Sequence, residues 1–274
     1  MGMLDHKVAI ITGSTRGIGK AMAHEFVREG ARVVITSSSI ANVQAAVAEF
    51  PSGTAYGCLC NVVSLADMEQ LIVAATSRFG KLDCFINNAG ISDSFRSITE
   101  SDPDEWGRVI DTNLKGTYNG CRAAISYFLR ENMQGKVINM AGSGSDSGSN
   151  TPWISAYGST KAAIARFTYA VAEEYRHTGI SVMLLHPGLV RTGMVSADNP
   201  THELSRQLAT FNTILDIFAQ PPSVAAKLAI KLASSWSDTK TGVYLSALNG
   251  RRKKRLLLTY PFRKITNRID RRTY

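Results

Sequence analysis

The sequence predicts an α/β fold in which helices cover both faces of a doubly wound parallel sheet. Short apolar segments rich in β-branched residues alternate along the chain with longer segments of helical periodicity. The turns between these segments are short, so each strand, helix and following strand is expected to form a right-handed crossover. Three layers, α/β/α, are therefore expected over residues 1–250 as a single domain.

The first half of the chain shows this alternation most clearly. Residues 7–12 (KVAIIT) form a continuous apolar run, as expected of a strand buried on both faces. A glycine-rich turn and a helix over 20–30 follow. The remaining expected elements of this half are a strand at 31–36, a helix at 42–50, a strand at 54–59, a helix at 65–79 and a strand at 84–86.

The second half continues the pattern with one irregular helix. Helical periodicity extends over 103–130, but the sequence DTNLKG at 111–116 is poor helix material, so something other than helix propensity is expected to favour it there. The other expected elements are a strand at 136–140, a serine- and glycine-rich loop at 141–150, a helix that carries Tyr157, a strand at 181–185 and a last strand at 241–245.

The turn after the first strand has the character of a phosphate-binding loop. Its sequence TGSTRGIG has the spacing G-x-x-x-G-x-G and lies between a strand and a helix. Glycines let backbone N–H groups approach a ligand, and the N-terminus of the following helix favours an anion. Dinucleotide binding is expected at Gly13, Ser14, Thr15, Arg16, Gly17, Ile18 and Gly19.

The end of the second strand indicates which dinucleotide is bound. An acid there would accept hydrogen bonds from the ribose of NAD, whereas a 2′-phosphate requires hydroxyl or arginine donors. The chain has Ser37, Ser38 and Ser39 at this point, and Arg16 is available in the glycine loop. The sequence therefore favours NADP over NAD.

Tyr157 and Lys161 form a candidate acid/base pair. They are four residues apart at the start of a helical segment, so their side chains share one face. A fixed positive charge beside a phenol favours the phenolate and is expected to lower the pKa of Tyr157 toward a useful range. A solvated helix face can carry the same spacing, so the pair gains meaning only from other motifs.

Composition narrows the class of protein. The four cysteines, Cys58, Cys60, Cys84 and Cys121, lie in apolar segments without metal-ligand spacing, so free, buried thiols and no metal site are expected. The N-terminal residues show no signal-peptide pattern, and no apolar run reaches the roughly 18 residues of a membrane span. A soluble, cytoplasmic protein is expected.

The formal net charge of +9 is concentrated at the C-terminal end. Positions 251–274 hold ten of the 31 basic residues and one of the 22 acidic residues, which leaves 21 of each in residues 1–250. Nucleic-acid binding by the body is therefore not expected.

This basic extension is predicted to contain a short amphipathic helix that begins behind Pro261. Its apolar positions are Phe262, Ile265 and Ile269. The helix could dock on a neighbouring subunit, rest on an anionic membrane surface, or bind an acidic partner or nucleic acid; docking within an oligomer is favoured.

Six motifs in order resemble the short-chain dehydrogenase/reductase family, in its compact single-domain branch. They are T-G-x-x-x-G-x-G, N-N-A-G at 87–90, an asparagine within D-T-N, a serine loop, Y-x-x-x-K and P-G-x-V-x-T at 187–192. The resemblance covers residues 6–250 and implies a Rossmann-like fold that catalyses hydride transfer between a nicotinamide cofactor and a carbonyl or alcohol. It also implies a homo-oligomer, either a dimer or a tetramer.

The resemblance also implies roles for individual residues. Tyr157 would be the acid/base, Lys161 would hold the nicotinamide ribose and lower the tyrosine's pKa, a serine would bond the reacting oxygen, and Asn113 would support a proton relay. Further cofactor contacts would come from Asn61, Val62, Asn88, Ala89, Gly90, Pro187, Gly188, Val190 and Thr192. The protein positions the cofactor and manages the proton.

The catalytic serine is displaced relative to the family pattern. The position three residues after Asn139 is Gly142, and the position thirteen residues before Tyr157 is Gly144. Ser143 and Ser145 are the nearest hydroxyls, and Ser143 is favoured. Asn61 also stands where the family often has an aspartate that contacts adenine.

Residues 193–222 are expected to form a lid over the substrate. Phe95, Trp153 and Met194 are expected to form apolar pocket walls. Two functions follow. The favoured one is an NADP-dependent oxidoreductase that interconverts a carbonyl and an alcohol; the alternative, motivated by the displaced serine, is a nucleotide-binding regulatory or scaffold protein of the same fold with a basic interaction tail.

Overall fold

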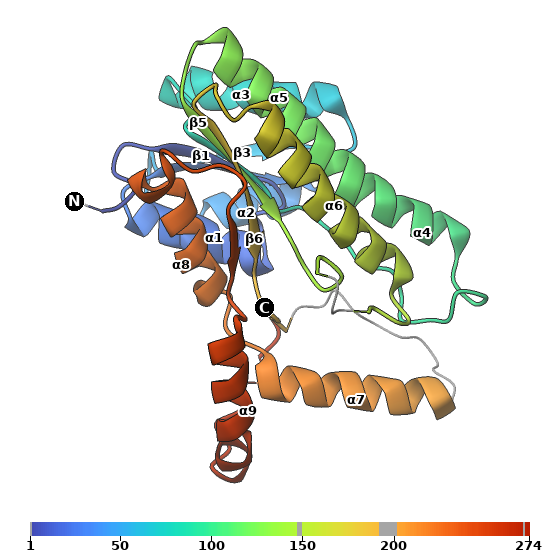
Figure 1. Ribbon diagram of the computed structural model, residues 1–274. Helices are drawn as coiled ribbons and strands as arrows, with labels where there is room; N and C mark the ends of the chain where they lie inside the picture. The colour runs from blue at the N-terminus through green and yellow to red at the C-terminus, as the bar shows by residue number, and fades with distance from the viewer. Residues whose placement is uncertain (1, 147–149, 192–201, 271) are drawn as a thin grey trace.

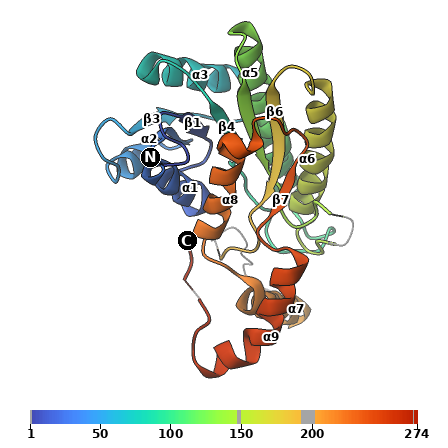
Figure 2. The same cartoon turned by 60° about the vertical axis from the view of Figure 1, so that its left-hand side comes forward.

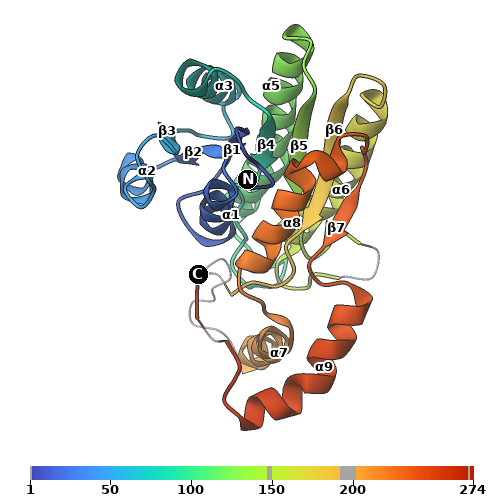
Figure 3. The same cartoon turned by 90° about the vertical axis from the view of Figure 1, so that its left-hand side faces the viewer.

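Seven parallel strands form one sheet (Figure 1) in the order β3-β2-β1-β4-β5-β6-β7, which can be followed in Figure 3. The computed structural model describes residues 2–146, 150–191, 202–270 and 272–274. The strands are β1 Val8–Ile11, β2 Arg32–Ser37, β3 Ala55–Leu59, β4 Cys84–Asn87, β5 Gly135–Met140, β6 Ile180–His186 and β7 Tyr244–Ser246. The predicted doubly wound α/β fold is confirmed.

Helices cover both faces of the sheet, as Figure 3 shows edge-on. On one face lie α1 Gly17–Arg28, α2 Ile40–Val47 and α8 Ser223–Ala233; on the other lie α3 Leu65–Phe79, α5 Gly116–Arg130 and α6 Ser155–Glu174. The remaining helices are α4 Pro103–Ile110, α7 His202–Phe218 and α9 Gly250–Ile265, with a short 3-10 turn at Ser235–Ser237.

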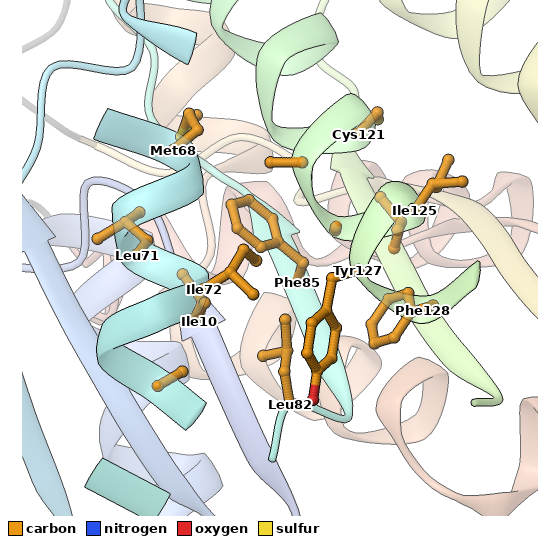
Figure 4. Close-up of a cluster of buried hydrophobic side chains, with 14 of the residues drawn as sticks. Ile10, Met68, Leu71, Ile72, Leu82, Phe85, Cys121, Ile125, Tyr127 and Phe128 are labelled. Carbon is orange, nitrogen blue, oxygen red and sulfur yellow. The ribbon is translucent and has the colours of Figure 1, made fainter. Parts of the chain in front are cut away.

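The sheet separates two apolar cores, because parallel strands bury both faces. Phe85 of β4 packs with Met68 and Leu71 of α3 and with Phe128 of α5 in one core (Figure 4). The opposite core is built on Phe26 of α1 and on the apolar face of α8. These two cores fix the strands whose carboxyl ends carry the candidate site.

The strand order reverses at β1 and β4. The chain runs outward from β1 through β2 to β3 and then returns to place β4 on the other side of β1. Loops after these two strands therefore diverge in opposite directions, which opens a crevice at the carboxyl ends of the strands. The glycine loop and the N-N-A-G segment border this crevice.

The helix predicted over 103–130 is three consecutive segments. A π-helical turn, Asp111–Lys115, joins α4 to α5. Such turns occur frequently at functional sites because the wider turn redirects side chains and carbonyl groups. The poor helix material at 111–116 is thus accommodated by a change of helix type, and Asn113 lies at its centre.

Several element boundaries differ from the prediction by one to three residues. The helix after the glycine loop begins at Gly17 instead of residue 20, so the last two glycines belong to its first turn. The last strand is Tyr244–Ser246 instead of 241–245, because it pairs with β6 through Tyr244 opposite Leu184.

The C-terminal helix was predicted to begin behind Pro261, and this prediction is wrong. Helix α9 begins at Gly250, where the Asn249 side chain caps it by accepting a hydrogen bond from Arg252 N at 3.0 Å. Pro261 lies inside the helix, and Ile269 lies beyond its end. Lysine, arginine and leucine are strong helix formers, and they extend the helix toward the body of the protein.

The structure also tests the expectations about the cysteines and about membrane-spanning helices. Cys58, Cys60, Cys84 and Cys121 are free, as predicted, but Cys58 is only half-buried instead of buried. Burial raises the pKa of Cys84 and Cys121 to about 12. Across the ranges that the structure describes, no helix combines the length and apolar character required to cross a bilayer.

Candidate functional site

The glycine loop and the N-N-A-G segment are joined by hydrogen bonds across the crevice. Thr12 Oγ1 accepts from the backbone N–H groups of Asn88 and Ala89, each at 2.9 Å. The Asn88 amide donates to Thr12 O at 2.8 Å and to Gly13 O at 3.2 Å. The Asn88 side chain, predicted to lie at the cofactor site, is therefore used to hold the two loops together.

Close backbone approach explains two of the glycines. Gly13 has φ +61°, a left-handed conformation that favours glycine. A Cβ atom at Gly19 would lie 2.5 Å from the Asn88 amide nitrogen and 2.6 Å from Gly13 O. Without these side chains, the loop packs against residues 88–89 and leaves the start of α1 open.

The start of α1 suits the diphosphate of a dinucleotide. Within the described residues no side chain caps this helix, and its first turn contains no acid. Uncapped N–H groups and the positive end of the helix dipole favour an anion at this point. The residues present thus fit the cofactor that the sequence predicts.

The Ser14 hydroxyl stabilises the loop from within. It donates to Ile11 O at 2.6 Å and accepts from Thr36 N at 3.0 Å, while Gly13 N donates to Thr36 Oγ1 at 3.2 Å. Ser14 is fully buried. Its side chain links β1 to β2 and is fully used within the protein. The predicted contact of Ser14 with the cofactor can therefore come only from its backbone.

Arg16 and Ser38 are exposed at the edge of the crevice, at the glycine loop and just after β2. Ser37 Oγ accepts from Ser39 N at 3.2 Å, and Ser39 caps α2. The residues predicted to distinguish NADP from NAD thus lie on neighbouring loops at the same end of the sheet.

Asn61 and Val62 follow β3. Asn61 is exposed, and its side chain accepts from Val63 N at 3.1 Å. The carbonyl of Val62 accepts from the Asn119 amide at 3.0 Å. This turn is therefore held by the Asn61 side chain and by Asn119 of α5.

The Tyr157 hydroxyl lies against the backbone of Gly142. A Cβ atom at Gly142 would overlap this hydroxyl and would lie 3.1 Å from Lys161 Cγ. Gly142 is the position where the count from Asn139 in the family pattern expects the catalytic serine. The phenol occupies the space that a side chain there would need, so a larger residue at position 142 requires the Tyr157 hydroxyl or the loop to shift.

Lys161 is held at the carboxyl end of β5. Its Nζ donates to Met140 O at 3.0 Å and lies 5.5 Å from the centre of the Tyr157 ring. The two side chains share a face of α6, as the spacing predicted. Lys161 is 5% exposed, so a buried ammonium accompanies a phenol at the end of a central strand.

Burial shifts the pKa values of this pair in opposite directions. It raises the pKa of Tyr157 to about 12 and lowers the pKa of Lys161 to about 8. The expected lowering of the tyrosine's pKa by Lys161 is therefore wrong for the protein alone, where desolvation of the phenolate dominates. At neutral pH, Tyr157 carries its proton and Lys161 is charged.

The two candidate serines differ in what their side chains do. Ser145 Oγ donates to Lys161 O at 3.1 Å and accepts from Gly142 N at 3.0 Å, so it closes the loop. Ser143 lines a cavity beside the pair. The geometry favours Ser143 as the hydroxyl that meets a substrate.

Asn113 connects the π-helical turn to its surroundings and is fully buried. Its Oδ1 accepts from Ile91 N at 2.8 Å, and its Nδ2 donates to Ile91 O at 2.9 Å and to Thr160 Oγ1 at 3.1 Å. The asparagine thus binds the loop after β4 to the helix that carries Tyr157. These three hydrogen bonds hold the two elements in a fixed relative position.

Asp93 is a functional residue that the sequence reasoning missed. Its carboxylate accepts from the backbone N–H groups of Ala156 and Tyr157, each at 3.1 Å, and its side chain is buried. It therefore caps α6, where Ile154 offers no side-chain cap. Sixty-three residues separate Asp93 from Ala156, so no local sequence signal reveals this contact.

A cavity of about 640 Å³ lies beside Ser143, within the size range of small-molecule sites. Phe95 and Trp153 form part of its wall, as predicted, whereas Met194 and Thr192 lie outside the described residues. The apolar lining also includes Ile154, Leu189, Phe211, Ile214, Phe218 and Leu248.

Tyr157 is not among the residues that line this cavity; its ring packs against the cluster of Phe95, Ile154 and Leu204 at the cavity's edge. Helix α7 supplies Phe211, Ile214 and Phe218 to the lining, at spacings i, i+3 and i+7. This helical spacing of apolar residues in α7 is a signal that the sequence did contain.

His186 ends β6 and faces the same cavity. Its Nδ1 accepts from Gly188 N at 3.0 Å, and burial lowers its pKa, so the neutral ring carries its proton on Nε2. Gly188 has φ +77°, which turns the predicted P-G-x-V-x-T segment back across the strand ends. Pro187 is buried and Val190 half-buried in this turn.

Comparison with known proteins agrees with this geometry. The sequence model of the short chain dehydrogenase family matches residues 7–203. Two proteins described as uncharacterized oxidoreductases, from Mycobacterium bovis and Mycobacterium tuberculosis, are each 35% identical over 252 residues, which is 91% of this chain and 98% of theirs. A probable chlorophyll(ide) b reductase of Arabidopsis thaliana is 30% identical over 256 residues, which is 86% of this chain and 50% of that protein.

The fold, the crevice and these matches together define an oxidoreductase of the class that uses a nicotinamide cofactor, NAD or NADP. More specifically, the chain belongs to the short-chain dehydrogenase/reductase family. The resemblance that the sequence motifs indicated is confirmed.

Proposed function

We propose that this protein is an NADP-dependent oxidoreductase that interconverts a largely apolar carbonyl compound and its alcohol. The observation that carries the proposal is the packing of Tyr157 and Lys161 against Gly142 at the end of β5, next to Ser143, which lines a mainly apolar cavity. The relatives named as chlorophyll(ide) b reductases support reduction of a large substrate.

In this proposal the residues manage the proton and the oxygen. When bound, the cofactor supplies or accepts the hydride. Ser143 donates a hydrogen bond to the substrate oxygen, and Tyr157, protonated at neutral pH, gives its proton to that oxygen as negative charge develops. Lys161 holds the ribose, and the Asn113 turn keeps this helix face aligned and supports the proton relay.

Tyr157→Phe tests the proposal. It removes the proton donor but keeps the ring, so we expect carbonyl reduction with NADPH to fall by roughly 10²- to 10⁴-fold. NADPH binding, followed by the fluorescence of the bound cofactor, should be unchanged. If the wild-type protein turns over nothing across a broad panel of carbonyls and alcohols, the regulatory or scaffold alternative replaces the enzyme proposal.

In this proposal Arg16 and Ser38 select NADPH over NADH by binding the 2′-phosphate. A charged hydrogen bond to the 2′-phosphate is worth about 1.5–3 kcal/mol, so Arg16→Ala should raise the KM for NADPH by roughly ten- to hundred-fold and leave that for NADH unchanged. Arg28→Ala, an exposed arginine at the other end of α1, is the matched control. Equal effects on both cofactors would contradict the assignment.

We also propose a cytoplasmic homo-oligomer. Its four free thiols suit a reducing compartment. Tyr118, Leu129 and Tyr169 are exposed on the outer sides of α5 and α6, where a second copy would bury them. The mass of the protein in solution, measured by light scattering, tests the assembly.

A further inference from the structure

Helix α9 combines a high positive charge with exposed apolar side chains. Between Gly250 and Ile265 it carries seven lysines and arginines and no acid. Three apolar side chains, Leu258, Phe262 and Ile265, are spaced i, i+4 and i+7 and therefore share one face. They are 81%, 60% and 86% exposed. We call these three residues the apolar stripe.

The body of the protein holds α9 by its opposite side. Arg263 Nη2 donates to Ile217 O of α7 at 2.7 Å, and Leu256 is half-buried. In Figures 1 and 2, α9 lies with α7 beyond the carboxyl ends of the strands, away from the sheet. The stripe is thus left facing outward by contacts that use a different face of the helix.

Charge decides which partner fits this face. A second copy of the chain offers a body with equal numbers of acids and bases and another strongly positive α9, so it provides little to attract seven cations. A nucleic acid would neutralise the cations but would leave the apolar stripe in water. A bilayer with anionic headgroups satisfies both, since lysine and arginine bind the headgroups while leucine and phenylalanine enter the acyl boundary.

We propose that α9 docks this protein on an anionic membrane surface as a peripheral, interfacial helix. The apolar stripe lies in the boundary between headgroups and acyl chains, and Lys254 and Arg255 bind the headgroups. The helix does not span the bilayer. This proposal stands independently of the catalytic activity.

Flotation of the full chain with vesicles tests the proposal. One vesicle is phosphatidylcholine alone, and the other contains phosphatidylserine as a minor component. We expect binding to the second only, weakening as salt rises. Leu258→Asn with Phe262→Asn should reduce partitioning by roughly tenfold or more, because two apolar side chains no longer transfer from water.

The cations are tested separately. Lys254→Gln with Arg255→Gln should weaken partitioning by roughly tenfold or more at low salt, whereas Arg28→Gln with Arg78→Gln, which removes two exposed charges from the body, should leave it unchanged. Equal binding to both vesicles, equal loss in the control pair, or no vesicle binding would overturn the proposal. If the wild-type protein does not bind vesicles and the Leu258 and Phe262 variant has a different oligomeric mass from wild type, the stripe contacts a second copy of the chain instead.

Discussion

Gly142 and Tyr157 show how one backbone position constrains the proposed acid/base. A Cβ atom at residue 142 would overlap the Tyr157 hydroxyl, so the absence of a side chain there leaves room for the phenol. Ser143, one residue later, faces the cavity instead. The arrangement moves the serine by one position while leaving the tyrosine and lysine where the family motif has them.

Gly142→Ser should therefore damage the site, although it places a serine where the count from Asn139 in the family pattern expects one. The new side chain must displace the Tyr157 hydroxyl or the loop, and we expect the rate of substrate reduction to fall by roughly ten- to hundred-fold. Gly107→Ser is the matched control, because a Cβ atom there meets nothing within 4 Å. A gain in activity from Gly142→Ser would contradict this account.

Lys161 is expected to reduce stability in the absence of cofactor. Its pKa is about 8 in the folded protein and 10.5 in the unfolded reference, so between these values the unfolded state binds more protons and stability rises with pH. Below about 8 the burial penalty is fully present. The direction follows from burial of the ammonium.

Lys161→Met removes this titration. Relative to wild type, the variant should gain most at neutral pH, and its advantage should shrink by on the order of 3 kcal/mol as pH rises to about 10.5. Urea unfolding of both proteins at several pH values measures the difference. A difference in the free energy of unfolding between the two proteins that does not change with pH would contradict the lowered pKa of Lys161.

At the scale of elements, the position of α6 depends on contacts from distant parts of the chain. Asp93 caps its first turn, and Asn113 of the π-helical turn bonds Thr160 within it. Gly158 packs so closely against Thr151 that a side chain there would overlap the threonine. The helix that carries Tyr157 and Lys161 is thus oriented from three directions.

Asp93→Ala should affect catalysis as well as stability. Losing two hydrogen bonds to a buried carboxylate costs about 1–3 kcal/mol, and the displaced α6 should lower kcat by roughly ten- to hundred-fold. Asp102→Ala removes the cap of α4, which costs about 1 kcal/mol, and should leave kcat unchanged. Denaturation midpoints and steady-state kinetics of both variants distinguish positioning from general destabilisation.

The sequence predicts elements where local pattern and burial agree. The buried strands and the glycine loop follow from continuous apolar runs and from the strand-turn-helix order, and Tyr157 with Lys161 follows from helical spacing. The contacts of Asp93 and Thr12 could not be predicted this way, since each side chain bonds residues more than 60 positions away. The start of α9 was missed because Pro261 suggested a boundary, whereas proline is tolerated in this helix.

At the scale of the whole molecule, one sheet joins two cores that lie on opposite faces. Phe26 belongs to the core under α1 and α8, and Phe128 to the core under α3 and α5; both are fully buried. The strands between them take part in both cores. We therefore expect residues 1–250 to behave as one cooperative unit, as the single-domain prediction requires.

Phe26→Leu and Phe128→Leu test this unit. Each should lower the free energy of unfolding by about 1–2 kcal/mol, and the double variant by the sum, because the two residues share no neighbours. Tryptophan fluorescence and far-UV circular dichroism should report the same midpoint. Two separate unfolding transitions would show that residues 1–250 contain two independently unfolding units.

The charge distribution of the chain has a consequence for its behaviour in solution. Removal of residues 251–274 leaves 21 acidic and 21 basic residues, so the isoelectric point falls from about 9.5 toward neutrality. Proteins without net charge at the working pH tend to associate and precipitate. We expect a protein shortened in this way to associate more readily than the full-length chain, whereas changes of single side chains on α9 leave most of the net charge in place. The basic extension thus supplies the net charge of an otherwise neutral chain.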